Sequence, residues 1–311
     1  MRELVPKAFA LLLVFATIYL VLFGVLCTVQ RDGTPWIYRT NEYFKWKGGI
    51  SYQKFQEFDP HRSYDVVFLG SSHAYRGYDP ELFGHRGYSA FNLGTSAQSP
   101  LNSYFIVKHY LNARNTGLLV FDAYEVAMEI DGMESTMDLS QNISMDRAAV
   151  EMALAHRDPR GLNMVTLRAM RSSAEPMYSD SNYRQGGAVI LADSVKKELH
   201  YQVGKPLDLN PVQMNYLRKI FALCTERKIP LVLVNHYFPK ASDREKHRAF
   251  NDRLQREMAP FGLKYFDLAY DHQLDDRDHF YDHNHLNAAG ARIFNAQLID
   301  LLERDGVLKA P

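Results

Sequence analysis

Short, continuous apolar runs constrain the fold of this chain more than any other feature. Val66–Leu69, Gly117–Phe121 and Pro230–Val234 are rich in aliphatic residues and lie between polar or turn-forming residues, a pattern typical of strands that are buried on both faces. Ser89–Gly94 predicts a further strand and turn, and Leu263–Asp267 predicts a shorter strand nearer an edge. Because helical stretches separate these runs, the order predicts an α/β fold, a three-layer sandwich with a central, mainly parallel sheet of about five strands.

The stretches between the apolar runs have the spacing of helices that bury one face. One begins at about Pro80, where Asp79 can act as the N-cap, and the closing helix runs from about Asn287 to Glu303. The others cover Leu101–Leu111, Pro211–Arg227 and Arg244–Met258.

The alternation of strands and helices is interrupted between about residues 126 and 206. Met145–Ala155 and Gly187–Glu198 have helical patterns there, and no clear strand is present. An insertion of this size between sheet elements usually forms a lid or a partner surface. We therefore expect a lid or a partner surface here, and the sequence assigns it no chemistry.

An uncharged run of 19 residues, Phe9–Cys27, stands near the start of the chain. As a helix it would span about 28 Å, close to the thickness of a bilayer's hydrocarbon core. Arg2 and Lys7 precede it, so the positive-inside rule predicts a cytoplasmic N-terminus. The run is longer than the apolar region of a signal peptide, and bulky Leu26 makes lipoprotein cleavage before Cys27 a poor fit.

These observations divide the chain into a cytoplasmic segment, an anchor, a lead-in and one domain. Residues 1–8 are predicted to be cytoplasmic, 9–28 to cross the bilayer, 29–64 to form a juxtamembrane lead-in, and 65–311 to form the α/β domain. The protein is thus expected to be single-pass in the inner (cytoplasmic) membrane, with its C-terminal domain in the periplasm or another extracytoplasmic space. Aromatic residues in the lead-in suit either the membrane interface or ordinary packing.

The overall charge balance excludes one large class of partners. The chain has 36 Lys and Arg residues against 36 Asp and Glu residues, so no global basic field favours nucleic acid. Its two cysteines, Cys27 and Cys224, fall in the apolar run and in a predicted helix, which makes a disulfide between them implausible. We expect no cofactor.

Two short motifs carry the predicted chemistry. Gly70-Ser71-Ser72-His73 follows the first strand, and a serine at a strand-to-helix turn is where α/β enzymes place a nucleophile. Asp282 stands three residues before His285, just ahead of the closing helix, where a carboxylate can orient an imidazole base. We predict Ser72 as the nucleophile, His285 as general base and acid, and Asp282 as the orienting carboxylate, with Ser71 as the fallback nucleophile.

Other interpretations of these residues stay open. Asp276 and His279 form a second Asp-x-x-His pair upstream. Imidazoles and carboxylates together also suit zinc, and the residues that could form such a site are His272, His279, Asp282, His283 and His285. Their spacing matches no zinc signature, so we predict no metal. His236 follows the fourth strand and is expected to be structural. His73 and Arg76 could contact an anionic substrate or belong to a solvated turn.

The combined motifs resemble those of the SGNH (GDSL-like) hydrolase superfamily. Gly-x-Ser at residues 70–72, Asn-Leu-Gly at 92–94 and Asp-x-x-His-Leu at 282–286 carry this resemblance, which covers roughly Asp65–Leu302. The single anchor is similar to the membrane-tethered branch that includes DltD-like and alginate O-acetylation proteins. The resemblance implies a flavodoxin-like fold. It also implies an extracytoplasmic O-acyltransferase or esterase that acts on an envelope glycan through an acyl-serine intermediate. The expected partner is a multispanning membrane-bound O-acyltransferase.

The chain departs from the family's pattern at the oxyanion hole. The resemblance assigns one backbone donor to Ser72, and the register from Asn92 places the next at Ala97, with Gly94 nearby. No asparagine follows the third strand, and losing one such donor costs about 3–4 kcal/mol of transition-state stabilisation. Tyr124 could replace it.

The absent asparagine also motivates a second hypothesis. In that hypothesis the protein is a catalytically silent scaffold that docks a membrane-bound O-acyltransferase or binds polysaccharide. It predicts that substitution of Ser72 is tolerated.

Overall fold

A five-stranded parallel sheet forms the centre of the computed structural model. The strand order is β4 (Ala90–Asn92), β3 (Tyr64–Leu69), β5 (Thr116–Asp122), β8 (Leu231–Asn235) and β9 (Lys264–Asp267), and each neighbouring pair is parallel. The structure describes residues 4–31, 34–39, 49–170, 181–192, 201 and 203–309. The predicted α/β fold is confirmed, including the edge position of the last strand.

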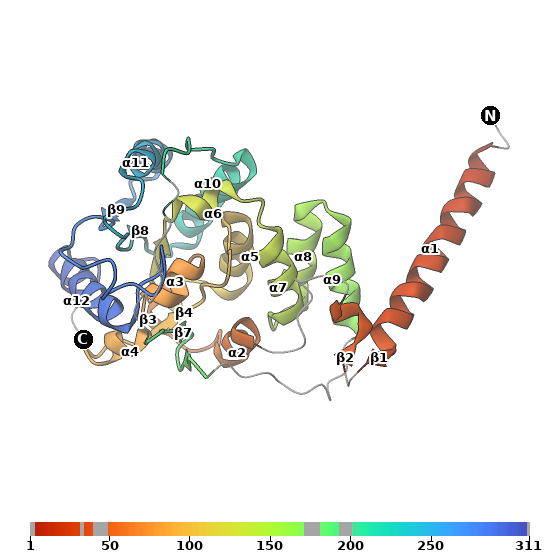
Figure 1. Ribbon diagram of the computed structural model, residues 1–311, viewed down its shortest axis with the longest axis horizontal. Coiled ribbons are helices and arrows are strands. Elements are labelled where there is room, and N and C mark those ends of the chain that lie inside the picture. Colours follow the sequence, from red (N-terminus) through yellow and green to blue (C-terminus); the bar gives the residue numbers. More distant parts are fainter. Residues whose placement is uncertain are drawn as a thin grey trace.

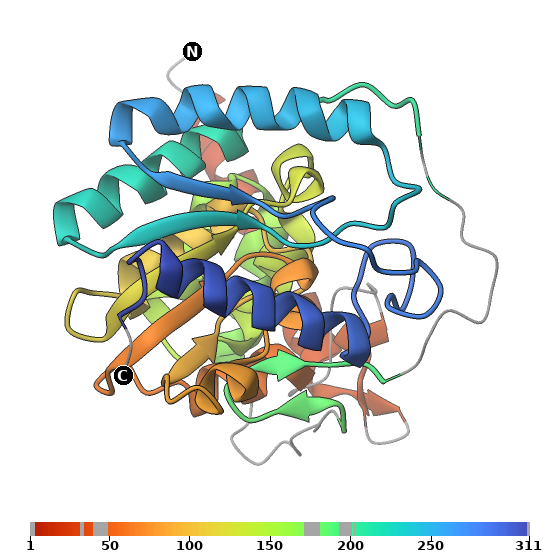
Figure 2. The ribbon, with the colours of Figure 1, turned by 90° about the vertical axis from the view of Figure 1, so that its left-hand side faces the viewer.

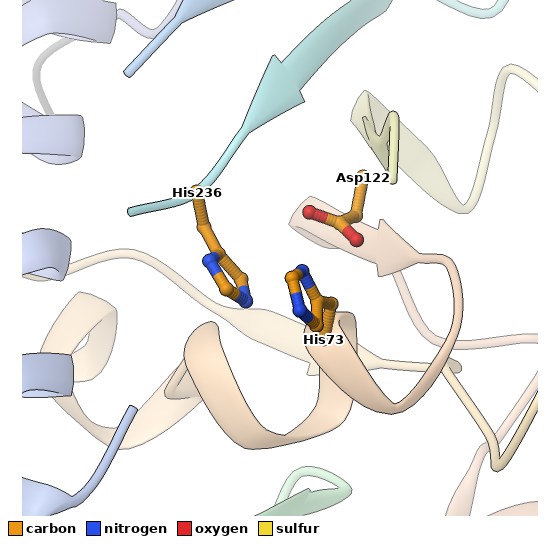
Figure 3. Close-up of side chains that lie close together, drawn as sticks. All are labelled: His73, Asp122 and His236. Carbon is orange, nitrogen blue, oxygen red and sulfur yellow. The ribbon is translucent and has the colours of Figure 1, made fainter. Parts of the chain in front are cut away.

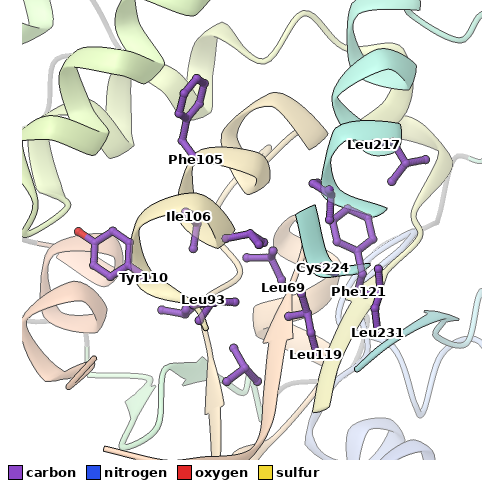
Figure 4. Packing of buried hydrophobic residues seen from close by; sticks show 14 of the residues in the cluster. Leu69, Leu93, Phe105, Ile106, Tyr110, Leu119, Phe121, Leu217, Cys224 and Leu231 are labelled. Atoms are coloured by element: carbon purple, nitrogen blue, oxygen red, sulfur yellow. The ribbon is translucent and has the colours of Figure 1, made fainter. Parts of the chain in front are cut away.

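Helices cover both faces of the sheet, as Figure 2 shows. Val67 and Leu69 of β3 point to the face covered by α5 (Pro100–Tyr110) and α10 (Pro211–Arg227). Val66 and Phe68 point to the opposite face, covered by α12 (Ala288–Arg304). Helix α11 (Arg244–Met258) and the 3-10 turn η2 (Ala259–Phe261) lead into β9 on the α5 and α10 side. This two-residue alternation between two cores is the reason for the continuous apolar strands, and Figure 4 shows one of those cores.

The turn after β3 forms a helix earlier than expected. Helix α3 (Ser72–Gly77) begins directly at Ser72, because the Ser71 hydroxyl accepts the backbone N–H of His73 at 3.3 Å and caps it. The helix predicted at Pro80 is present as α4 (Pro80–Gly84), whose N-cap Asp79 accepts the Glu81 N–H at 3.1 Å. Ser72 therefore stands at the first position of a helix.

The described part of the insertion contains four helices and a short hairpin. The helices are α6 (Glu125–Glu129), α7 (Met133–Asn142), α8 (Asp146–His156) and α9 (Pro159–Met170), and the hairpin pairs β6 (Tyr183–Arg184) with β7 (Ala188–Val189). A helix over Gly187–Glu198 is therefore wrong at its start, and residues 193–198 lie outside the described part.

The hairpin forms because Gly186 and Gly187 take positive φ angles of 90° and 93°. These angles suit a tight turn and not a helix. The Gly186 carbonyl also accepts the backbone N–H of Asn92 at 2.7 Å. The hairpin thus covers the exposed edge of the sheet at β4.

Helix α1 (Leu4–Thr28) is long and apolar enough to cross a membrane. It projects from the body, with α7, α8 and α9 between it and the sheet (Figure 1). Phe23 packs in a small core with Met133, Met137 and Met164, and the Tyr19 hydroxyl bonds to the Asn163 side chain. The last turns of α1 are therefore part of the folded body.

The lead-in is partly described. It contains the strand pair β1 (Gln30–Arg31) and β2 (Thr34–Pro35), the 3-10 turn η1 (Trp36–Arg39) and helix α2 (Gly49–Glu57). The aromatic residues Tyr43, Phe44 and Trp46, which the sequence offered for the membrane interface, lie outside the described residues.

Candidate active site

Ser72, His285 and Asp282 meet above the carboxyl edge of the sheet. The Ser72 Oγ lies 2.8 Å from the His285 Nε2, and the His285 Nδ1 lies 2.8 Å from the Asp282 Oδ2. Ser72 comes from the start of α3 after β3, and the other two come from the loop before α12. The structure thus brings together the three residues that were predicted as a triad.

A local turn fixes the acid and the base relative to each other. The Asp282 Oδ1 accepts the backbone N–H groups of Asn284 at 3.0 Å and His285 at 2.9 Å. Asn287 then caps α12 by accepting the N–H groups of Ala289 and Gly290. The His285 Nδ1 lies 2.8 Å from Oδ2 and 3.0 Å from Oδ1, so the same carboxylate holds the backbone of the turn and the imidazole, and the ring orientation is set before substrate binds.

The electrostatics of the pair suit a neutral base beside an ionised acid. Burial acts to raise the pKa of Asp282, but the hydrogen bond and charge of His285 and the two backbone N–H groups outweigh it and hold that pKa well below its usual range. Burial lowers the pKa of His285; the Asp282 hydrogen bond opposes this shift, and the Arg76 charge adds to it. At neutral pH His285 is therefore free to accept the Ser72 proton.

Arg76 contacts the triad from the same face of α3 as Ser72, one turn later. Its Nη1 lies 3.7 Å from the Asp282 Oδ2 and 3.3 Å from the His285 Nδ1, and its side chain is 24% exposed. The sequence offered Arg76 as a substrate contact. In the structure its guanidinium instead faces the acid–base pair, where it stabilises the carboxylate and disfavours a proton on the imidazole.

Ser71, the fallback nucleophile, is placed differently from Ser72. Its side chain is only 3% exposed, and its hydroxyl accepts the His73 N–H to cap α3. The hydroxyl that the base contacts is that of Ser72. The geometry therefore favours Ser72 as the nucleophile.

Two backbone N–H groups near Ser72 are available to an oxyanion. Within the described part of the chain, the N–H groups of Ser72 and Ala97 have no hydrogen-bond acceptor. Ala97 adopts φ +47°, a left-handed conformation that costs an alanine energy and often marks a functional loop. The Gly94 N–H, in contrast, donates to the Asn92 Oδ1 at 3.0 Å, so it has no free hydrogen for a substrate.

The loop that carries Ala97 is held from both sides. The Thr95 N–H donates to the Gly70 carbonyl at 3.2 Å. The fully buried ammonium of Lys54, on α2, donates to the Gly94 carbonyl, and burial lowers the pKa of Lys54 well below its usual value. The lead-in helix thus fixes the loop that carries Ala97, a role that its sequence did not suggest.

Tyr124, which the sequence offered as a replacement oxyanion donor, lies two residues after the end of β5. Its hydroxyl accepts the Asn284 Nδ2 at 3.2 Å, which leaves the hydroxyl hydrogen free to donate. Its ring stacks on His73, with the ring centroids 3.6 Å apart. Burial raises the pKa of Tyr124, so the hydroxyl stays protonated. A fixed, protonated hydroxyl is what a replacement donor requires.

Behind Tyr124, three polar side chains lie buried together, as Figure 3 shows. His73 is 0% exposed and belongs to the lining of a cavity that Tyr124 also lines; its contact with an anionic substrate stays a prediction. His236 donates from Nδ1 to the Tyr237 carbonyl at 2.7 Å, and burial lowers its pKa to about 3. Asp122 accepts the Tyr78 hydroxyl at 2.9 Å, and burial raises its pKa to about 8.

This cluster offers three ligand types that metals use, and their atoms lie within 4.8 Å of one another. However, the rings of His73 and His236 are stacked, 3.9 Å apart and only 17° from parallel. An imidazole lone pair lies in the plane of its ring, so two stacked rings cannot both direct lone pairs at one ion. The arrangement fits neutral packing groups better than a metal centre.

The metal set that the sequence offered as an alternative is dispersed. His272 contacts the Phe238 carbonyl at 2.7 Å, and His279 contacts the backbone of Asp275 at 3.2–3.3 Å. Asp122 and His236 were missed as a pair. The sequence could have indicated that they lie close together, because Asp122 ends the strand β5, His236 directly follows β8, and these two strands are neighbours in the sheet.

Comparisons with known proteins add similar folds at low identity. No family model matches the chain, and no curated protein matches it. A provisionally assigned acylhydrolase from Bacteroides fragilis has a TM-score of 0.43 at 11% identity, covering 83% of this chain and 99% of its own.

Two other solved structures are similar to the chain. A GDSL-like lipase from Bacteroides thetaiotaomicron has a TM-score of 0.41 at 11% identity and covers 83% of this chain and 100% of its own. A family 3 carbohydrate esterase from Clostridium thermocellum has a TM-score of 0.37 at 13% identity, with 78% and 98% covered. Likeness at this level assigns neither a family nor an activity to the chain.

Proposed function

We propose that this protein is a serine-dependent acyltransferase or esterase that works through an acyl-Ser72 intermediate. The observation that carries the proposal is the continuous hydrogen-bonded chain Ser72–His285–Asp282, with both distances at 2.8 Å. A nucleophile within reach of a base, and a base oriented by a carboxylate, are the parts that acyl transfer requires.

The proposed reaction has two halves. In the first, the His285 Nε2 takes the Ser72 proton while Oγ attacks the acyl carbonyl, and Nε2 then gives that proton to the departing alkoxide. In the second, an alcohol or water gives its proton to Nε2 and attacks the acyl-Ser72 carbon, and Ser72 leaves and recovers the proton. The carboxylate of Asp282 stabilises the imidazolium in both halves.

The developing oxyanion would be held by three donors. Among the residues that the structure describes, the backbone N–H groups of Ser72 and Ala97 have no acceptor, and the hydrogen of the Tyr124 hydroxyl has none either. Tyr124 takes the place of the absent asparagine in this proposal. A hydroxyl held by stacking and by Asn284 would recover part of the roughly 3–4 kcal/mol that one oxyanion donor contributes.

In this proposal the catalytic domain lies on the outer side of the cytoplasmic membrane. Helix α1 has the length and apolarity to span a bilayer, and Arg2 and Lys7 precede its uncharged run. The acceptor in this proposal is a hydroxyl of a cell-envelope glycan, and a multispanning membrane-bound O-acyltransferase is the expected partner that supplies the acyl group. Because the end of α1 packs against the insertion, the catalytic domain would be held against the membrane and not loosely tethered.

The test compares two neighbouring serines in the full chain purified in detergent. Ser72→Ala is expected to abolish release of p-nitrophenol from p-nitrophenyl acetate, and Ser71→Ala is expected to retain most of it. Circular dichroism and membrane fractionation check that both variants fold and insert. Undiminished activity in Ser72→Ala would contradict the proposal and favour the scaffold hypothesis.

A further inference from the structure

A cavity of about 320 Å³ is lined by His73 and Asn284, which are the neighbours in sequence of Ser72 and His285, and the ring centroids of His73 and His285 lie 5.6 Å apart. Its wall is built from residues that follow β5 and β8 and from the loop that carries His285, including Tyr124, Phe238 and Asn284. In the sheet, β5 and β8 lie on one side of β3, and β4 lies on the other. The cavity therefore lies on the opposite side of Ser72 from the loop that carries Ala97.

This position associates the cavity with one partner in the reaction. Asn284 and His283 line the cavity and precede His285 directly. An alcohol bound in the cavity thus lies on the side of the base with which it must exchange a proton.

The wall of the cavity contains polar atoms that have no protein partner. Among the described residues, the Asn284 Oδ1 and the Tyr201 hydroxyl are buried without a hydrogen bond. Buried polar groups are normally satisfied, by protein, water or a ligand. Burial raises the pKa of Tyr201 to about 12, so its hydroxyl can donate while the Asn284 oxygen accepts. A ligand with hydroxyl groups can do both.

The remaining lining suits a small ligand without net charge, because two lysines, Lys205 and Lys246, balance two carboxylates, Glu125 and Asp243. The rings of Tyr124 and Phe238 meet at 83° with centroids 5.8 Å apart, which forms an apolar corner. The Lys246 ammonium is paired with Glu129 at 2.6 Å, and the Glu125 carboxylate faces His247 at 3.6 Å. The volume is at the lower end of the range for ligand pockets, which fits one sugar-sized unit and not a long acyl chain.

The geometry points to an acceptor subsite that holds one neutral, hydroxylated, sugar-sized unit of the acyl acceptor, with the reacting hydroxyl directed at the His285 Nε2. This inference rests on the acyl-transfer function proposed above. In the step it describes, the acceptor O–H proton moves to Nε2, the acceptor oxygen forms a bond to the acyl carbon, and the bond from that carbon to the Ser72 Oγ breaks as Oγ takes the proton.

The experiment measures how the acyl-enzyme partitions between water and an added alcohol. The full chain in detergent is given p-nitrophenyl acetate with either methyl β-D-glucopyranoside or cyclohexylmethanol, and acetylated alcohol and free acetate are quantified. The ratio of transfer to hydrolysis reports on the acceptor alone, because both products arise from the same intermediate. Wild-type protein is expected to favour the glucoside over cyclohexylmethanol.

Three variants make the test specific. Tyr201→Phe should lower the glucoside ratio about five-fold, as for loss of one neutral hydrogen bond, and should leave the cyclohexylmethanol ratio unchanged. Phe238→Leu, which keeps the site apolar, should lower both ratios. Tyr216→Phe, on α10 away from the cavity, is the matched control and should change neither.

Three results would overturn the subsite while leaving the proposed function intact. In the first, the wild-type protein hydrolyses the ester but does not favour the glucoside. In the second, the glucoside ratio is unchanged in both Tyr201→Phe and Phe238→Leu. In the third, Phe238→Leu changes the preference among acetyl, butyryl and hexanoyl esters but not the glucoside ratio. The last result would place the acyl chain in the cavity. Failure of the proposed function is distinct, because p-nitrophenol release would then not depend on Ser72.

Discussion

Replacing Asp282 with asparagine isolates the role of the carboxylate without removing the turn around it. In the native site the Oδ1 of Asp282 accepts two backbone N–H groups, at 3.0 and 2.9 Å, and the Oδ2 accepts the His285 Nδ1–H at 2.8 Å. The asparagine oxygen can keep both backbone bonds. Its amide N–H₂ then faces the imidazole, so His285 is held in the tautomer with its proton on Nε2, where it cannot accept the Ser72 proton.

The expected loss follows from that tautomer. In a Ser-His-Asp enzyme the same change lowers kcat by about 10⁴, which corresponds to about 5.5 kcal/mol at about 1.36 kcal/mol for each factor of ten. We expect a loss of this order in p-nitrophenyl acetate hydrolysis by Asp282→Asn. Thermal unfolding should change little, because the backbone hydrogen bonds of the turn persist.

The chain offers a matched control in its second Asp-x-x-His motif. Asp276 accepts the backbone N–H groups of Lys240 at 2.8 Å and Ala241 at 3.1 Å, and His279 contacts Asp275 instead. Asp276→Asn should therefore keep kcat within about two-fold, since it touches no part of the triad. Activity of Asp282→Asn within ten-fold of the wild type, or equal losses in the two variants, would refute the assigned role.

Three further substitutions test the surroundings of the triad. Arg76→Gln removes a positive charge that disfavours a proton on His285, so the pKa of His285 should rise and the acidic limb of the kcat/KM profile should move to higher pH; an unmoved or lower limb would contradict this. Ser71→Ala removes a helix cap worth about 1 kcal/mol, so it should lower Tm by about 2–4 °C while activity persists. Loss of activity in a folded Ser71→Ala variant would contradict Ser72 as the nucleophile. Ala97→Gly relieves the strain of φ +47° and should raise stability by up to about 1 kcal/mol with kcat kept within two-fold, as a backbone donor requires; a large loss of kcat would show that more than the N–H matters.

The sheet could be predicted from the sequence because its information is local. Each buried strand is a continuous apolar run, and the observed β5 (Thr116–Asp122) and β8 (Leu231–Asn235) differ from the expected bounds by one residue at each end. Ser72 and His285 could also be paired, because parallel strands place their carboxyl ends at one edge.

What the sequence missed depends on contacts between distant segments. Nothing in the residues around Lys54 indicates that its ammonium reaches the Gly94 carbonyl. The same is true of the stack of His73 between Tyr124 and His236, which replaces an expected solvated turn. Strand β7 was mistaken for the start of a helix because it has only two residues, and so short a strand shows no alternation of apolar and polar positions in the sequence.

The most direct test of the central claim is the site of covalent labelling by a fluorophosphonate, located by peptide mass spectrometry on the full-length protein. The geometry predicts one phosphonylated residue, Ser72, with labelling retained in Ser71→Ala and lost in His285→Ala. No labelling of the folded protein, a label on Ser71, or labelling that persists at its full rate in His285→Ala would contradict a serine nucleophile activated by this histidine.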